Sequence, residues 1–219
     1  MLQRRLLLIA CLSLCAAPAL AQDPISSTAP PVPTPAPAPD LGKTVRVDLK
    51  TGAGTIVLEL YPDKAPITVA NFLRYVKGHR YDGVDIYRAV HTPGVPETGF
   101  IQGGVQNDPK RVLPAIRLEP TTVTGLHHKD GTITMARLSP NSATSDFVIM
   151  IGDNSSYMDA NPAGTGDNLG YAAFGQVAGG MDVVKKILTL PADGHARNPV
   201  MKGQILDPPV VIISARVEN

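Results

Sequence analysis

Clustered basic residues are missing from this sequence, which is 219 residues long. Its 20 Lys and Arg side chains are nearly balanced by 19 Asp and Glu, so the formal net charge is only +1. A protein that binds nucleic acid needs Lys and Arg gathered in one region to contact the phosphates. The composition therefore argues against a nucleic-acid partner and predicts weak electrostatic steering of any partner.

A hydrophobic run long enough to cross a membrane is also missing. The apolar run Leu6–Leu14 is shorter than the roughly 18 to 20 residues that span a bilayer. It follows Arg4 and Arg5 and precedes the small-residue site Ala19–Ala21, an order typical of a secretory signal peptide. We therefore predict a signal peptide over residues 1–21, a mature chain from Gln22 and no integral membrane span after its removal.

Cysteine is scarce, and its position supports the same reading. The chain has two cysteines, Cys11 and Cys15, and both lie inside the predicted signal peptide, so the exported protein has neither thiols nor disulfides. Two other routes remain open, because the paired arginines permit twin-arginine export and Leu8–Cys11 resembles a lipoprotein cleavage box. Every route leads out of the cytoplasm. We expect a periplasmic protein, with secretion beyond the cell as the alternative.

Residues 22–40 are rich in proline, alanine, serine and threonine, which indicates an extended polyproline-like linker. Its seven prolines are Pro24, Pro30, Pro31, Pro33, Pro35, Pro37 and Pro39. The linker is either a stiff spacer that holds the domain off a surface or a ligand for a proline-recognising module. Residues 41–219 contain no internal repeat and no second linker, so we predict that they form one domain, which we expect to be a monomer.

Short strand patterns dominate this domain. Alternating apolar and polar residues predict a hairpin from Val45–Leu49 and Thr55–Leu60. Two helices are expected, one after Pro66 that stops at Gly78 and one over Met181–Leu190. The further predicted strands are Asp85–Val90, Phe100–Gln102, Gly131–Ala136, Phe147–Ile151, Ala173–Val177 and Val210–Val217. Many strands with two helices favour a mainly β fold, a small closed barrel whose ends are capped by the helices.

Several motifs occur along the domain in a characteristic order and spacing. They are Tyr81-Asp82-Gly83, Tyr87-Arg88, Phe100-Ile101-Gln102-Gly103-Gly104, Gly131–Arg137, Pro140-Asn141-Ser142, Ser145-Asp146-Phe147 and Phe174–Val177. Each motif alone is a weak signal. Together, from Val45 to Val217, the chain resembles the cyclophilin family. The resemblance implies an eight-stranded closed antiparallel β-barrel capped by two α-helices, peptidyl-prolyl cis-trans isomerase activity and proline-containing polypeptides as partners.

The resemblance implies that Arg88 is the catalytic residue. Rotation about an X-Pro bond faces a barrier of about 20 kcal/mol because resonance gives the C–N bond double-bond character. An arginine that donates to the prolyl nitrogen draws its lone pair out of that resonance and favours the twisted amide. No bond breaks in this reaction, so no nucleophile, metal or cofactor is expected. A surface arginine in a strand is the alternative reading of Arg88.

The resemblance also assigns residues that bind the substrate. Gln102 matches a family glutamine whose side-chain amide holds the substrate carbonyl, and Ala136 and Arg137 match the strand that pairs with the substrate backbone. Arg137 replaces a more usual asparagine. Phe100 either supplies a wall of the proline pocket or packs in the core, because Thr92–Gly99 is longer than the turn common in the family.

Other positions depart from the family pattern. Asp146 stands where glutamine is common, and Val148 stands where a second pocket phenylalanine is common. These changes predict a wider, less aromatic pocket and lower affinity for proline substrates. Tyr157 occupies roughly the place of a family tryptophan or other aromatic residue. Tyr171 matches a histidine that is often tyrosine in bacterial members, and its hydroxyl is expected to cap the pocket.

Two further features look like ligand sites but fit a ligand poorly. His127 and His128 have no cysteine or correctly spaced histidine nearby, so we predict a solvated loop and no metal. The glycine-rich segment Gly164–Gly170 lacks the lysine of a phosphate-binding loop, and we expect it to be an insertion over the barrel mouth.

Three functions remain open from the sequence. The first is an exported, cofactor-free isomerase that assists the folding of proteins outside the cytoplasm. The second is a cyclophilin-like module that binds extended proline-containing chains with weak or no catalysis, for which Asp146 and Val148 are the reason. The third, a barrel that stores a small ligand, fits less well because small barrels usually fill with side chains.

Overall fold

The structure, a computed structural model, describes residues 41–218 of the chain. The predicted signal peptide (1–21) and linker (22–40) lie outside these residues and stay predictions. Among residues 41–218, no helix is long and apolar enough to cross a membrane.

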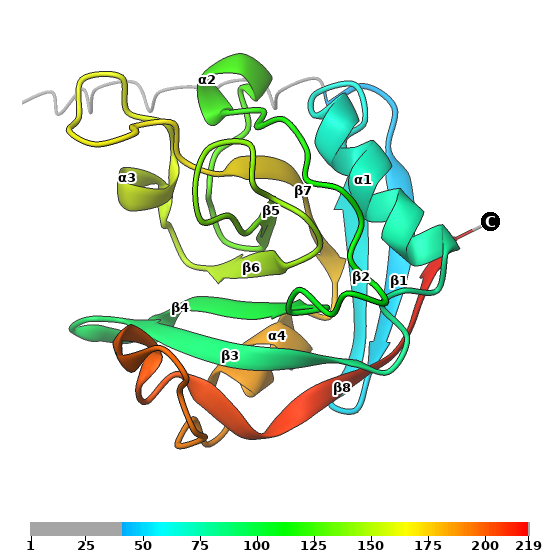
Figure 1. Cartoon of the computed structure of the whole chain (residues 1–219), viewed down its shortest axis with the longest axis vertical. Coiled ribbons are helices and arrows are strands. Elements are labelled where there is room, and N and C mark those ends of the chain that lie inside the picture. The colour runs from blue at the N-terminus through cyan, green and yellow to red at the C-terminus, as the bar shows by residue number, and fades with distance from the viewer. Residues whose placement is uncertain (1–40, 219) are drawn as a thin grey trace, which may run out of the picture. The chain divides into compact units, whose positions relative to one another are not determined.

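Eight strands close into one barrel, in the spatial order β1-β2-β7-β5-β6-β4-β3-β8, with every neighbouring pair antiparallel (Figure 1). The strands are β1 Val45–Thr51, β2 Gly54–Leu60, β3 Val84–Thr92, β4 Val95–Gly104, β5 Thr132–Met135, β6 Phe147–Ile151, β7 Ala172–Gly179 and β8 Ile205–Val217. The predicted barrel is confirmed. A closed sheet leaves no edge strand with unpaired backbone groups.

Within residues 41–218, two helices of two or more turns accompany the barrel, α1 (Pro66–Lys77) and α4 (Met181–Leu188), on different sides of it (Figure 1). The second helix ends two residues before the predicted Leu190. Three short helical turns were not predicted: α2 (Thr121–Thr124), α3 (Ser155–Met158) and the 3-10 turn η1 (Pro199–Met201). Single turns lack the repeated apolar spacing that marks a longer helix, so the sequence pattern did not reveal them.

The helix α1 reaches the core through its apolar face. Its Phe72 is fully buried and packs against Tyr81, Phe147 and Phe174, with ring centroids 5.1, 5.8 and 5.3 Å away. Aromatic pairs at such distances contribute roughly 0.5–1.5 kcal/mol each beyond the area that they bury. Side chains from α1 and from the barrel strands therefore form one packed core cluster.

Candidate active site

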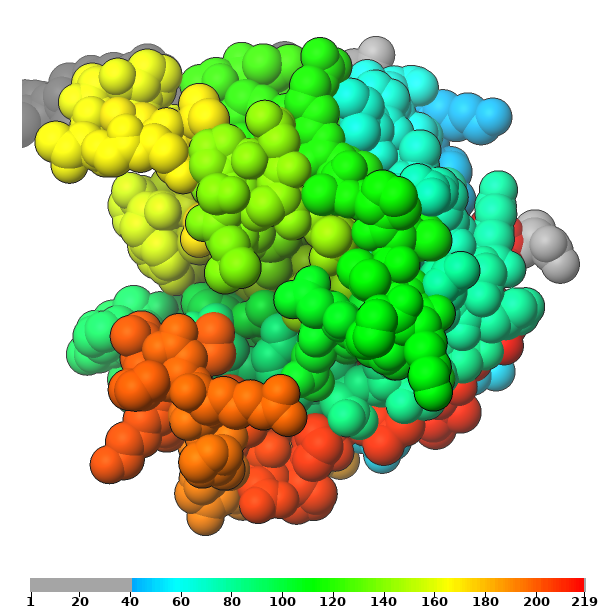
Figure 2. Space-filling model, viewed as in Figure 1, coloured from blue at the N-terminus to red at the C-terminus, as the bar shows by residue number. Residues whose placement is uncertain are grey.

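A cleft of about 750 Å³ opens on the surface beside β3, β4 and β6. Figure 2 shows the surface hollowed between the yellow-green part of the chain and the orange segment that precedes β8. The structure places all nine residues predicted for the site along this cleft: Arg88, Phe100, Gln102, Ala136, Arg137, Asp146, Val148, Tyr157 and Tyr171. The role of each residue stays a prediction.

A bulge in β3 directs Arg88 into the cleft. The register of β3 shifts between Ile86 and Arg88 against both neighbours, β4 and β8. Ile86 and Ala89 therefore both face the core, with 0% and 1% exposure, while Tyr87 and Arg88 both line the cleft. Strict alternation would have placed Arg88 on the core side with Ile86.

Two side-chain amides hold the guanidinium of Arg88. Its Nη1 donates to Oε1 of Gln102 at 2.9 Å, while its Nε and Nη2 donate to Oε1 of Gln204 at 2.9 and 2.6 Å. The guanidinium also lies 5.3 Å from the centroid of the Phe100 ring. A guanidinium has five N–H groups. The three used here leave one hydrogen on each terminal nitrogen for a ligand.

The charge of Arg88 is not neutralised by a neighbour. Within the described part of the chain, no carboxylate forms an ion pair with this side chain, and both of its acceptors are neutral amides. Burial lowers the pKa of Arg88 from its ordinary value, because desolvation disfavours the charged form. The group nevertheless remains a cation near pH 7. The positive charge of Arg88 therefore acts on a ligand in the cleft without being offset by a neighbouring carboxylate.

The contact with Arg88 also orients Gln102. This residue is 7% exposed and lies on β4, where it alternates with the fully buried Ile101. Because its Oε1 accepts from Arg88, its amide nitrogen keeps two donors for a ligand. The predicted role of Gln102, to hold a substrate carbonyl, needs a donor in this place.

A small apolar cluster forms one wall of the cleft, separate from the main core. Val148, Met150 and Met158 are buried in it, and Phe100 and Tyr171 pack against them. The Phe100 ring lines the cleft and packs against this cluster, outside the main core, and its predicted role in binding proline stays a prediction. Val148 is 5% exposed at the position where an aromatic ring was expected in the family, so this wall carries fewer rings.

Tyr87 and Asp146 join two sides of the cleft. The hydroxyl of Tyr87 donates to Oδ2 of Asp146 at 2.8 Å, and Oδ1 of Asp146 accepts from Ser145 Oγ at 2.8 Å and from the Gln106 N–H at 3.0 Å. Burial and the neighbouring carboxylate raise the pKa of Tyr87, so the phenol stays protonated. Both oxygens of Asp146 therefore accept hydrogen bonds from other parts of the cleft wall, and its predicted role in substrate binding stays a prediction.

Comparisons with known proteins decide the family. Residues 46–217 match the family described as "Cyclophilin type peptidyl-prolyl cis-trans isomerase/CLD". The chain belongs to this family.

Relatives agree with that membership, and a solved structure shares the fold. The chain is 36% identical over 174 residues to a peptidyl-prolyl cis-trans isomerase of Acinetobacter baylyi, covering 79% of this chain and 85% of the relative. It is 38% identical over 175 residues to one of Streptomyces antibioticus, covering 78% and 97%. A cyclophilin-type isomerase of Cryptosporidium parvum has the same fold, with a TM-score of 0.61, 18% identity and coverage of 81% and 99%.

In this cyclophilin, Ala136 and Arg137, which follow β5, contact residues next to β6 and β7. The N–H of Ala136 donates to the carbonyl of Asp146 at 2.7 Å, while the Arg137 guanidinium lies 5.0 Å from the centroid of the Tyr171 ring. Tyr157 is 52% exposed at the rim, and its hydroxyl donates to the Asn154 side chain.

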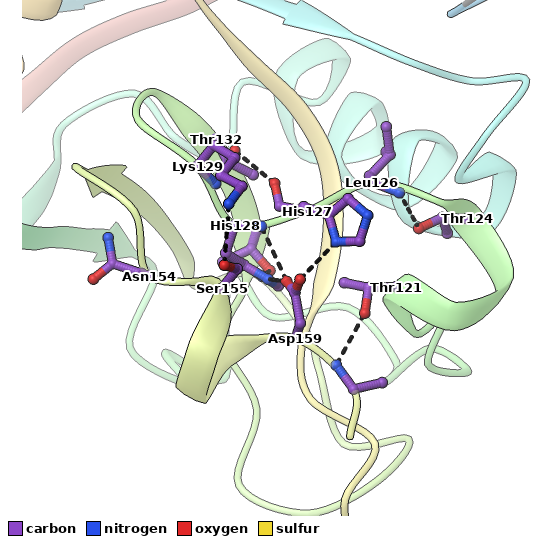
Figure 3. A network of polar contacts seen from close by, with 12 residues as sticks. Thr121, Thr124, Leu126, His127, His128, Lys129, Thr132, Asn154, Ser155 and Asp159 are labelled. Carbon is purple, nitrogen blue, oxygen red and sulfur yellow. Dashed lines mark hydrogen bonds and ion pairs between the residues drawn. The ribbon is translucent and has the colours of Figure 1, made fainter. Parts of the chain in front are cut away.

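The prediction of a solvated loop is wrong for His128. Its side chain is fully buried, whereas that of His127 is 60% exposed. Figure 3 shows both rings directed at Asp159, whose oxygens accept from His128 Nδ1 at 2.5 Å and from His127 Nδ1 at 2.7 Å. The Nε2 of His128 lies 3.0 Å from the hydroxyl of Thr134. Asp159 is 31 residues away in sequence, so no local pattern could reveal this burial.

Sequence reasoning missed one wall of the cyclophilin cleft. The segment between α4 and β8 contributes His195, Arg197, Asn198 and Met201 to the lining, and it also carries Gln204. No family motif covered this segment. The last strand was predicted to begin at Val210, whereas β8 begins at Ile205, so Gln204 lay outside every predicted element. Among the described residues, no group of three or more His, Cys, Asp or Glu side chains gathers in a way that could hold a metal ion.

Proposed function

We propose that this cyclophilin-type peptidyl-prolyl cis-trans isomerase uses Arg88 to twist X-Pro bonds in extended chains outside the cytoplasm. The observation that carries the catalytic part is the Arg88 guanidinium, held in the cleft by two neutral amides with two N–H groups left over.

The physical argument starts from the barrier. Rotation breaks the amide resonance, and in the twisted form the prolyl nitrogen regains a localised lone pair. A hydrogen bond to that lone pair exists only near the transition state, so it lowers the barrier without tightening the ground state. A cationic donor in a partly desolvated cleft makes this bond stronger than water could. Arg88 offers such a donor.

Gln102 and the apolar wall supply binding. The free amide hydrogens of Gln102 suit a substrate carbonyl beside the proline. Phe100 and Val148 offer apolar surface for the proline ring. Both anchors hold the proline half of the peptide, so the half that precedes the X-Pro bond is free to turn.

Export rests on the sequence alone. The order of Arg4, Arg5, the apolar run and Ala19–Ala21 supports a signal peptide, and the proline-rich residues 22–40 support a tether. We propose periplasmic residence and assistance to the folding of exported proteins. Fractionation of the cell envelope tests it: the protein in the periplasmic fraction without residues 1–21 supports export, and a full-length cytoplasmic protein overturns it.

The catalytic part is tested by following cis-to-trans isomerisation of a short proline-containing peptide. We expect the purified protein to accelerate it and Arg88→Ala to lower kcat/KM by about 100-fold or more. Arg117→Ala is the matched control, because Arg117 is an exposed arginine outside the cleft. If the two variants are equally active, the assignment of Arg88 is wrong.

A second function is favoured by one observation, the valine at position 148 in the pocket wall. A wider wall binds the proline ring less tightly, which suits a module that holds proline-containing chains with little catalysis. Negligible acceleration by the folded wild-type protein, combined with measurable peptide binding, would support this alternative.

A further inference from the structure

We infer that Gln204 is a positioning residue that fixes the plane of the Arg88 guanidinium while leaving its charge free. The inference deepens the proposed function and depends on it for its kinetic part. Its structural part, the bond between the two side chains, stands independently.

The geometry of the contact restricts Arg88 more than one hydrogen bond would. A single oxygen, Gln204 Oε1, accepts from both Nε and Nη2 of Arg88. These two donors lie on the same edge of the planar guanidinium, so the pair of bonds sets both the direction and the rotation of that plane. Gln102 holds the opposite terminal nitrogen, Nη1. One N–H group on each of Nη1 and Nη2 is left to bind a ligand.

Gln204 is itself held by three groups. Its side-chain nitrogen donates to the carbonyl of Val200 at 3.3 Å, and its N–H donates to the carbonyl of Met201 at 3.1 Å. Its own carbonyl accepts from the N–H of Ala89, the residue after Arg88, at 2.9 Å. The next residue, Ile205, pairs with Arg88 in the sheet. The backbone of Gln204 is therefore hydrogen-bonded to β3 at the residue next to Arg88, so the acceptor and the guanidinium are held at the same place along β3.

The neutral character of Gln204 has its own consequence. A carboxylate in this place would bind the guanidinium at least as well, but it would also cancel most of the charge that the substrate nitrogen experiences. An amide fixes the geometry without that cost. Arginine held only by neutral acceptors in a partly buried site is unusual, since buried charges are commonly paired.

The test compares Gln204→Met, which keeps the length and shape of the side chain but removes the acceptor, with the wild-type protein. We expect kcat to fall about tenfold, as misplacement of a catalytic group does, while KM changes less than about twofold. Gln204→Glu keeps an acceptor but adds charge, and we expect kcat to fall there too. Gln176→Met is the matched control, because Gln176 is an exposed glutamine on β7.

Hydrogen exchange at Arg88 distinguishes loss of positioning from a general loss of structure. The Nε–H of Arg88, identified in ¹H–¹⁵N spectra by its loss in Arg88→Lys, should exchange slowly with water in the wild-type and Gln204→Glu proteins and fast in Gln204→Met. Wild-type kcat in Gln204→Met would overturn the inference, as would unchanged Nε–H exchange. An inactive wild-type protein with this exchange pattern would instead refute the proposed function and leave the Arg88–Gln204 contact established.

Discussion

Arg137 and Asp167 form a two-point ion pair, in which Nη1 and Nη2 of the arginine donate to the two carboxylate oxygens at 2.7 and 2.8 Å. The same guanidinium donates from Nε to the carbonyl of Gly170 at 2.8 Å and lies against the ring of Tyr171. The side chain of Arg137 is only 6% exposed. One arginine therefore ties the cleft to the loop that carries Asp167.

This ion pair gives the first prediction. Asp167→Asn removes the charge that holds Arg137, so the Tyr171 ring should lose its fixed position at the edge of the cleft. We expect KM for a proline-containing peptide to rise two- to fivefold, roughly the energy of an ion pair in which one partner, here Asp167, is open to solvent. Steady-state kinetics of the peptide checks it.

A matched ion pair provides the control for Asp167→Asn. Asp153 accepts from Lys129 at 2.6 Å on an exposed part of the surface, outside the residues that line the cleft. Asp153→Asn should leave KM unchanged. If Asp167→Asn and Asp153→Asn change KM equally, the Arg137–Asp167 ion pair does not fix the position of the Tyr171 ring in the cleft.

The same ion pair sets a pH limit. Hydrogen bonding from Arg137 lowers the pKa of Asp167 to about 2, so the pair should persist down to about pH 3.

A second prediction concerns the start of α1. The helix begins after Ala65, whose side chain cannot cap it, and the buried carboxylate of Glu119 accepts instead from the N–H groups of Ile67 and Thr68 and from the Thr68 hydroxyl, at 3.1, 2.8 and 2.7 Å. An anion is favoured at a helix N-terminus. Glu119→Gln should lower the free energy of unfolding by about 2 kcal/mol, because a buried charged acceptor is lost.

Urea denaturation measures this change. Glu97→Gln is the control, since Glu97 is exposed and has no hydrogen-bond partner for its side chain within residues 41–218. We expect its unfolding midpoint to match that of the wild-type protein. If Glu119→Gln is as stable as Glu97→Gln, the contact from residue 119 does not serve as the cap of α1.

Regular elements could be predicted from the sequence because their cause is local. Alternation of apolar residues revealed β1 and β2, and the boundaries of β6 were predicted to the residue. The bulge that turns Arg88 outward was not foreseen, since inserting one residue in a ladder leaves no periodic signal.

The cleft shows the same division between local and distant causes. Motif order brought Arg88 and Gln102 together correctly in one place, because both lie in family motifs on paired strands. Gln204 is 116 residues from Arg88 and lies in no motif, so only the closed barrel reveals the contact. The burial of His128 depends in the same way on a partner that is distant in the sequence.

A third prediction separates the two roles of Phe100. Its ring packs on Val148 and faces the Arg88 guanidinium, so Phe100→Ala removes apolar surface from the cleft. We expect Phe100→Ala to raise KM for the peptide roughly tenfold, as the loss of part of an aromatic contact implies. The KM of Phe100→Leu should lie between those of the wild-type protein and Phe100→Ala. Steady-state kinetics and thermal unfolding of the same variants check this prediction. A lowered midpoint with unchanged KM would assign the ring to packing alone.

The last prediction follows from the buried His128. Burial lowers its pKa below the ordinary value of about 6.5, although the hydrogen bond to Asp159 opposes this effect. The folded protein therefore binds fewer protons at this site than the unfolded chain just below pH 6.5. The contribution of His128 to stability is present above that pH and is lost as the pH falls.

Denaturation midpoints measured between pH 7.5 and 5 test this sign. We expect the wild-type protein to lose stability on acidification and His128→Asn to lose less of it, because the site no longer takes up a proton. His195→Asn is the control, since His195 is an exposed histidine with no hydrogen bond among the described residues, and this variant should follow the wild-type curve. If His128→Asn and His195→Asn show the same pH dependence, the buried histidine is not the group that titrates.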